Sequence, residues 1–184
     1  MAKYLFDTCS LIALVRYYLP FDINGRLKDF IYKGFTNKFL MLKQVKDECE
    51  KVSGGLVFNE LPQIKTIKSI NFGEVATDKI HRLIDNNFII FQSQINRLES
   101  GEYEIQKQKF IESADFNLIY CAMQNNHTII TEETPANNNN KLFKKIPTIC
   151  EMQGIRCESI SQLLQTRLDI NFAIKSTMEN INSL

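Results

Sequence analysis

Short apolar runs alternate along the chain with longer segments of helical periodicity. Apolar residues that recur every three or four positions indicate amphipathic helices, whereas a brief run without that period suits a buried strand. The runs predict strands at residues 3–6, 39–42, 128–131 and 155–157. The periodic segments predict helices at residues 10–18, 23–33, 43–52, 75–86, 103–112, 114–125, 147–153 and 160–168, with Gly34 breaking the second. Strands that alternate with helices are typical of an α/β layer fold with a mostly parallel sheet.

Length and composition suit one globular domain. The chain has 184 residues, of which 44% are hydrophobic and 23% charged, enough for a sizeable core. We expect the domain to span residues 1–168 and the tail, 169–184, to dock as a helix on this domain, on a second copy or on a partner. Residues 61–112 carry less distinct patterns, and we expect helices there that pack on one side of the sheet.

Charge and cysteine content narrow the functional classes. The formal net charge is +1, so no global basic field indicates a polyanionic partner, and nucleic-acid binding would need a local patch. The five cysteines are odd in number and form no CxxC pair, which favours a reducing compartment over a disulfide scaffold. Neither a membrane-spanning stretch nor a signal peptide is recognisable, so we expect a cytoplasmic protein.

Asp7 ends the first predicted strand, directly before a predicted helix. A carboxylate in apolar surroundings is unfavourable unless it is paired or binds a metal. In open α/β sheets, ligands bind at the carboxyl ends of the strands. Asp7 is therefore the first candidate functional residue.

Three further acids are candidates for the same place. Glu48 lies beside the core face of its predicted helix, where Asp47 points away, although a surface glutamate is an alternative. Asp115 falls in the first turn of a helix capped by Ser113, where the helix dipole stabilises an ionised carboxylate. The alternative is a purely structural role, because Asp is common at this position of a helix. The third is one of two adjacent acids, Glu132 and Glu133, which follow a buried strand as Asp7 does, and a charged loop is the alternative there.

A cluster of such acids would point to divalent-metal chemistry. Carboxylate oxygens are the ligands that Mg²⁺ and Mn²⁺ prefer, and several acids in a confined site cannot all stay ionised without a cation. Metals held in this way position water for attack on a phosphodiester.

Several segments, in order along the chain, resemble the PIN-like nucleases, a family that includes toxins of bacterial toxin–antitoxin modules. The matching segments are Tyr4–Ile12, Val45–Glu48, Ser113–Ile119 and Ile129–Glu133. A closing segment, Lys145–Glu151 with Gly154 and Ile155 after it, resembles an uncharacterised branch of PIN-like proteins.

The resemblance implies a fold, an activity and a set of ligands. It implies a three-layer α/β/α fold and a metal-dependent endoribonuclease that hydrolyses RNA. The implied ligands of Mg²⁺ or Mn²⁺ are Asp7, Glu48, Asp115 and Glu133, with Thr131 and Ser10 as hydrogen-bonding groups behind them. The implied partners are an RNA substrate and an antitoxin protein, and a homodimer through the tail is a further expectation.

Two departures from the family keep other functions open. Cys9 stands where the family often has Asn or Ser, and Glu133 stands where it usually has Asp. The alternatives are a degenerate PIN-like module that binds RNA or protein without cutting it, and a metal-dependent phosphatase. For Cys9 a packing role is favoured, because a neighbouring carboxylate disfavours the thiolate that a nucleophile requires.

Other site classes lack their motifs. The two histidines, His81 and His127, show no paired spacing that would indicate a zinc site. No GxxxxGK[ST], GxGxxG or GxSxG motif occurs. Lysines near the candidate acids could contact a nucleic-acid backbone at the rim, although a solvated charged face is the alternative; they are Lys43, Lys46, Lys141, Lys144 and Lys145.

Overall fold

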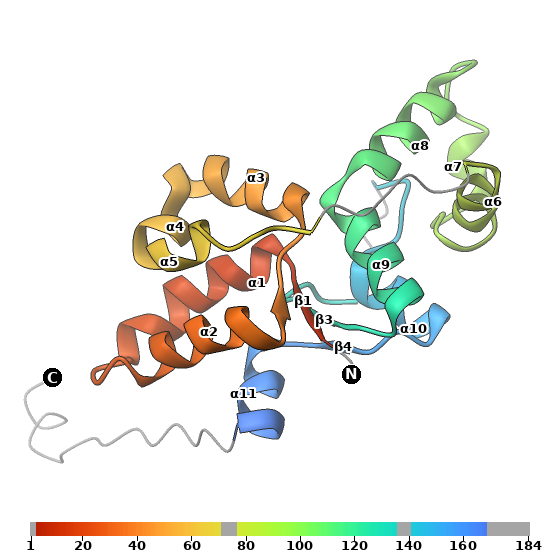
Figure 1. Ribbon diagram of the computed structural model, residues 1–184. Helices are drawn as coiled ribbons and strands as arrows, with labels where there is room; N and C mark the ends of the chain where they lie inside the picture. The colour runs from red at the N-terminus through yellow and green to blue at the C-terminus, as the bar shows by residue number, and fades with distance from the viewer. Residues whose placement is uncertain (1–2, 71–76, 136–140, 169–184) are drawn as a thin grey trace, which may run out of the picture.

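A four-stranded parallel sheet forms the centre of the protein (Figure 1). The computed structural model describes residues 3–70, 77–135 and 141–168. The strand order is β2-β1-β3-β4, so that the first strand is central. The strands are β1 (Tyr4–Phe6), β2 (Phe39–Leu40), β3 (Thr128–Ile130) and β4 (Cys157–Glu158). Helices flank this sheet, which confirms the predicted α/β fold and its three-layer α/β/α arrangement.

The register brings the ends of the two central strands together. Leu5 pairs with Ile129, and Phe6 with Ile130. Because β1 and β3 are parallel, the residues that follow both strands emerge at the same edge of the sheet. The Asp7 amide continues the ladder by donating to the Ile130 carbonyl oxygen at 3.0 Å.

Helices make up most of the remaining described chain. In the first half they are α1 (Thr8–Ala13), the π-helix η1 (Leu14–Tyr18), the 3₁₀-helix η2 (Leu19–Phe21), α2 (Arg26–Asn37), α3 (Lys43–Lys51), the 3₁₀-helix η3 (Val52–Gly55), α4 (Leu56–Glu60) and α5 (Pro62–Lys65). In the second half they are α6 (Thr77–Asn87), α7 (Gln92–Ile95), α8 (Glu102–Glu112), α9 (Ala114–Asn125), α10 (Ile146–Gln153) and α11 (Ile160–Leu168). Across the described residues, the structure has no helix with the length and apolar character that a bilayer crossing requires.

Most predicted elements are present, with three corrections. The predicted break at Gly34 is wrong, because α2 continues through it to Asn37. The predicted α-helix at residues 10–18 changes to a π-helix at Leu14. The predicted last strand, residues 155–157, is shifted towards the C-terminus, to Cys157–Glu158. The expected helical tail, residues 169–184, lies outside the described residues, as do residues 75 and 76 of one predicted helix.

The continuation of α2 has a packing cause. A Cβ atom at Gly34 would overlap the ring of Phe39 on β2, so the missing side chain lets this helix lie directly on the ring. Phe39 is 5% exposed, and its ring also contacts Phe6 and Phe35 at centroid distances of 4.8 and 5.6 Å. Tertiary packing therefore overrides the weak helix propensity of glycine here.

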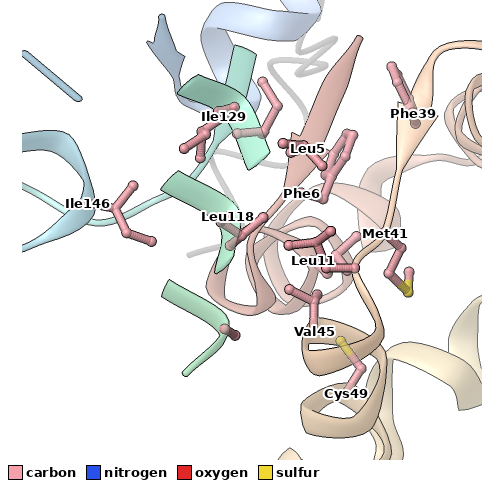
Figure 2. Close-up of a cluster of buried hydrophobic side chains, with 14 of the residues drawn as sticks. Leu5, Phe6, Leu11, Phe39, Met41, Val45, Cys49, Leu118, Ile129 and Ile146 are labelled. Carbon is pink, nitrogen blue, oxygen red and sulfur yellow. The ribbon is translucent and has the colours of Figure 1, made fainter. Parts of the chain in front are cut away.

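One hydrophobic core joins the sheet to the helices around it (Figure 2). Leu5 and Phe6 of β1 are fully buried, as are Leu11 of α1 and Leu118 of α9. Val45 and Cys49 of α3 are also fully buried. This packing fixes α1, α3 and α9 relative to β1, and these are the elements that carry or precede the candidate acids.

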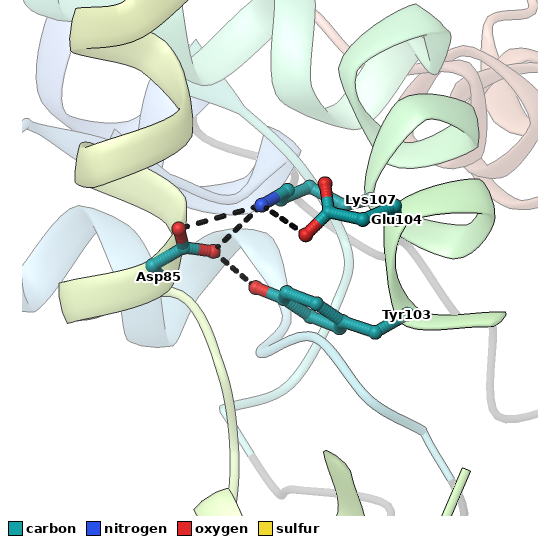
Figure 3. A network of polar contacts seen from close by, with 4 residues as sticks. All are labelled: Asp85, Tyr103, Glu104 and Lys107. Carbon is teal, nitrogen blue, oxygen red and sulfur yellow. Dashed lines mark hydrogen bonds and ion pairs between the residues drawn. The ribbon is translucent and has the colours of Figure 1, made fainter. Parts of the chain in front are cut away.

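A polar network ties α6 to α8 (Figure 3). The Lys107 side chain is only 4% exposed, and its Nζ lies 3.2 Å from Asp85 Oδ1 and 2.9 Å from Glu104 Oε1. Tyr103 donates a hydrogen bond to Asp85 and lies beneath the Lys107 ammonium group. A buried cation of this kind is tolerated because both carboxylates neutralise it.

Candidate active site

Asp7 lies at the junction of β1 and α1 and is 5% exposed. Its backbone is extended and its side chain does not cap α1, so the carboxylate is available for other contacts. Asp7 Oδ2 accepts hydrogen bonds from Cys9 Sγ at 2.7 Å and from Thr131 Oγ1 at 2.9 Å. Burial raises the pKa of Asp7, although these two hydrogen bonds act in the opposite direction. The carboxylate is thus held firmly in an environment that disfavours its charge.

The Thr131 hydroxyl connects the ends of β1 and β3. Besides donating to Asp7, Thr131 Oγ1 accepts from the Glu133 amide at 3.1 Å and lies 3.2 Å from Cys9 Sγ. Thr131 is 3% exposed, so these contacts are shielded from water. Ser10 acts differently from Thr131, because its hydroxyl donates to the Asp7 main-chain oxygen at 2.7 Å and not to the carboxylate.

Glu48 reaches the same region from α3. Its Oε2 accepts a hydrogen bond from Thr8 Oγ1 at 2.6 Å. Glu48 is half-buried beside the fully buried Cys49, whereas Asp47 is exposed. The contact with Thr8 places the Glu48 carboxylate next to the first residue after Asp7.

The charges of all three other candidate acids affect the pKa of Asp115. It lies in the first turn of α9, whose cap Ser113 accepts from the Phe116 amide at 3.2 Å. Burial raises the pKa of Asp115 to about 7, and the negative charges of Asp7, Glu133 and Glu48 contribute to the rise. Burial and the like charges thus disfavour the ionised form, as expected for several acids in a confined site without a cation. Lys141 only partly offsets them.

Glu133 and its neighbour Glu132 accept hydrogen bonds from the N-termini of two different helices. Glu133 Oε2 accepts from the amide of Ile146, the first residue of α10, at 3.2 Å. Glu132 Oε1 accepts from the amide of Ile160, the first residue of α11, at 2.7 Å. A carboxylate at a helix N-terminus satisfies a free N–H group and interacts well with the dipole. Of the two, Glu133 is the acid whose charge reaches both Asp7 and Asp115.

The four acids match a hard divalent cation in chemistry but do not form a coordination shell as placed. They supply carboxylate oxygens from four different segments, and their mutual repulsion at Asp115 is what a bound cation would relieve. However, no group of three or more His, Cys, Asp or Glu side chains among the described residues is arranged to hold a metal ion. One oxygen of Glu48 accepts from Thr8 and one oxygen of Glu133 accepts from the Ile146 amide, which leaves the second oxygen of each carboxylate for a ligand.

Two polar contacts of the site were not recognised in the sequence. Cys9 was assigned to packing, yet its thiol hydrogen-bonds to Asp7 and approaches Thr131. Burial and the Asp7 charge raise the pKa of Cys9 to about 12, which agrees with its dismissal as a nucleophile. Thr8 had no assigned role. Thr8 and Cys9 stand one and two residues after a strand-end acid, and this position is the signal in the sequence that could have indicated their contacts.

The lysines near the site have different surroundings. Lys46 Nζ donates to the Ile67 carbonyl oxygen at 3.2 Å, and Lys144 Nζ to the Asn87 carbonyl oxygen at 2.8 Å, so both support the fold. Lys141 is exposed and acts on Asp115 through its charge. Of these three lysines, Lys141 is the one best placed to contact a phosphate at the rim.

Comparison with known proteins assigns the chain to a family but not to an activity. Residues 4–172 match the model of a family described as a domain of unknown function, DUF4411, and the chain belongs to that family. No curated protein matches the chain. The match extends from β1 past α11, so it includes all four candidate acids.

Proposed function

We propose that this member of the DUF4411 family is a metal-dependent endoribonuclease of PIN-like type. In this proposal Asp7, Glu48, Asp115 and Glu133 hold Mg²⁺ or Mn²⁺. The observation that supports it best is that four acids distant in the sequence meet at one edge of the sheet. Burial raises the pKa of Asp115, and the charges of the other three acids add to the rise. A shared negative field of this kind is what a divalent cation needs.

The surrounding residues would prepare the acids for this role. Thr131 and Cys9 hold one oxygen of Asp7, and Thr8 orients Glu48, so that two of the acids keep defined positions. A bound divalent ion would supply acidification of water and stabilisation of charge on the scissile phosphate. Because the pKa of Asp115 is raised to about 7, its carboxyl group must release a proton before it can bind a cation. Cleavage should therefore weaken as the pH falls below neutrality.

The proposal is tested by changing Asp7 to Asn. This substitution keeps the shape of the side chain and removes the charge, so metal-dependent cleavage of an end-labelled RNA should fall by about 100-fold or more, as for loss of a principal charge-stabilising group. Exposed Asp47→Asn, on the adjacent α3, is the matched control and should cleave like the wild type. Circular dichroism checks that both variants fold. Cleavage by Asp7→Asn at the wild-type rate would refute the proposal.

One observation favours a second candidate, a PIN-like module that binds RNA or protein without cutting. The carboxylates of the described residues are not arranged as a ready-made ligand set. Calorimetric titration with Mn²⁺ distinguishes the two candidates, because a degenerate site should show no binding that Asp7→Asn abolishes. Hydrolysis of a small phosphomonoester in the same preparations tests the phosphatase alternative. The antitoxin partner, the homodimer and the cytoplasmic location stay predictions from the sequence.

A further inference from the structure

A cavity of about 320 Å³ adjoins the acid cluster. Thr131 and Glu133 belong to its wall, so it opens directly beside the proposed catalytic centre. Much of the remaining wall comes from α10 and from β4 with the residues after it, and it includes Pro135, Pro147, Glu151 and Glu158. Its volume lies near the lower end of the range for small-molecule sites, roughly 300–1,000 Å³, and suits one nucleobase.

Hydrogen bonds fix one wall of this cavity. Glu133 accepts from the Ile146 amide at 3.2 Å, and Thr148 Oγ1 donates to the Pro135 carbonyl oxygen at 3.0 Å. Both bonds join the segment after β3 to the first turn of α10. The cavity wall is therefore coupled to the same residue, Glu133, that belongs to the acid cluster.

The lining excludes a phosphate group and suits a neutral hydrogen-bond donor. Glu133, Glu151 and Glu158 all contribute to it, and three carboxylates would repel an anion. Pro147 and Glu151 are four residues apart on α10, so both lie on the face of this helix that lines the cavity. The proline ring offers an apolar surface. Glu151 is exposed, so its carboxylate lies at the solvent-facing side of the cavity and can accept hydrogen bonds from an entering ligand.

We propose that this cavity is a base subsite that selects guanine next to the phosphodiester bond that is cut. Guanine carries two N–H donors, at N1 and N2, on one edge, and the two oxygens of the Glu151 carboxylate can accept both. Adenine, cytosine and uracil each place an acceptor beside the donor on that edge, and the acceptor would face a carboxylate oxygen. A guanine held against Pro147 would leave its neighbouring phosphate at Glu133 and the other acids. This inference rests on the proposed nuclease function and adds its base preference.

Replacing one guanosine by inosine tests the proposed contact between the guanine 2-amino group and Glu151. The substrates are two oligouridines of equal length, one with a single guanosine and one with inosine, which lacks the 2-amino group. In Mn²⁺ the wild type should cut beside guanosine, and about 10-fold more slowly beside inosine, as expected for loss of part of a bidentate base contact. Glu151→Gln should cut both substrates at similar rates, because its amide presents a donor where guanine needs an acceptor. Glu60→Gln, at an exposed glutamate of α4, is the matched control and should keep the wild-type ratio.

Two results would overturn the base subsite while leaving the nuclease intact. They are equal cleavage beside guanosine and inosine by the wild type, and an unchanged ratio in Glu151→Gln. If the wild type cuts neither oligonucleotide, the nuclease proposal fails, and the subsite is judged by fluorescence anisotropy with the same oligonucleotides in metal-free buffer. Tighter binding of the guanosine oligonucleotide that is lost in Glu151→Gln supports the subsite, whereas equal affinities refute it.

Discussion

Replacing Asp115 by Asn should change how the stability of the metal-free protein depends on pH. Burial and three neighbouring acids raise the pKa of Asp115 from its ordinary value of 3.8 to about 7 in the folded protein. Between these two values the folded state binds a proton that the unfolded state has released, so the free energy of unfolding falls as the pH rises. The amide introduced by Asp115→Asn carries no charge at any pH, so the variant escapes this loss.

The size of the effect follows from the pKa change. A difference of about three units, at about 1.4 kcal/mol per unit, corresponds to about 4 kcal/mol. Asp115→Asn should therefore match the wild type in stability near pH 4 and exceed it by about 4 kcal/mol near pH 8. Such a gain would be large for a single substitution, since most substitutions destabilise.

Urea denaturation followed by circular dichroism measures this difference. Wild type, Asp115→Asn and the exposed control Asp47→Asn are unfolded at several pH values in the presence of a chelator. Added Mn²⁺ should then stabilise the wild type at alkaline pH by about 2.7 kcal/mol when the ion exceeds its dissociation constant 100-fold, and it should stabilise Asp115→Asn less. A stability difference between wild type and Asp115→Asn that does not vary with pH would refute the shared negative field at Asp115.

Two further predictions concern the framework around the site. Gly34→Ala places a methyl group against the buried ring of Phe39 and should destabilise the protein by about 1–3 kcal/mol, seen as a lower Tm; an unchanged Tm would show that the ring can move aside. Asp85→Ala leaves the buried Lys107 ammonium with one carboxylate partner fewer and should cost about 2 kcal/mol in urea denaturation, whereas a loss below about 0.5 kcal/mol would contradict the role of the network.

The sheet edge was predictable because parallel strands impose a simple geometric rule. Asp7 and Glu133 both follow short apolar runs, and strand ends that share a direction meet at one edge. Glu48 was harder to place, because its helix carries acids on two faces, Asp47 and Glu48. Only the core positions on this helix indicated which of the two lies nearer the interior. The structure places the charge of Glu48 within reach of Asp115, which helical periodicity alone could not decide.

The parts that the sequence did not predict depend on contacts between different helices and strands. The continuity of α2 at Gly34 requires the Phe39 ring, which no local propensity encodes. The thiol of Cys9 meets Thr131, 122 residues away, only when β1 and β3 are paired. The rise in the pKa of Asp115 likewise depends on burial and on charges from other elements, which the sequence alone does not place.

The central position of β1 has a consequence during synthesis. Asp7 leaves the ribosome long before Thr131, whose hydroxyl group donates to its carboxylate, and Glu133 follows two residues after Thr131. No nascent chain that ends before β3 contains the complete set of acids. If the protein cuts RNA, the message being translated is thus protected from its own product until β3 and Glu133 have been made.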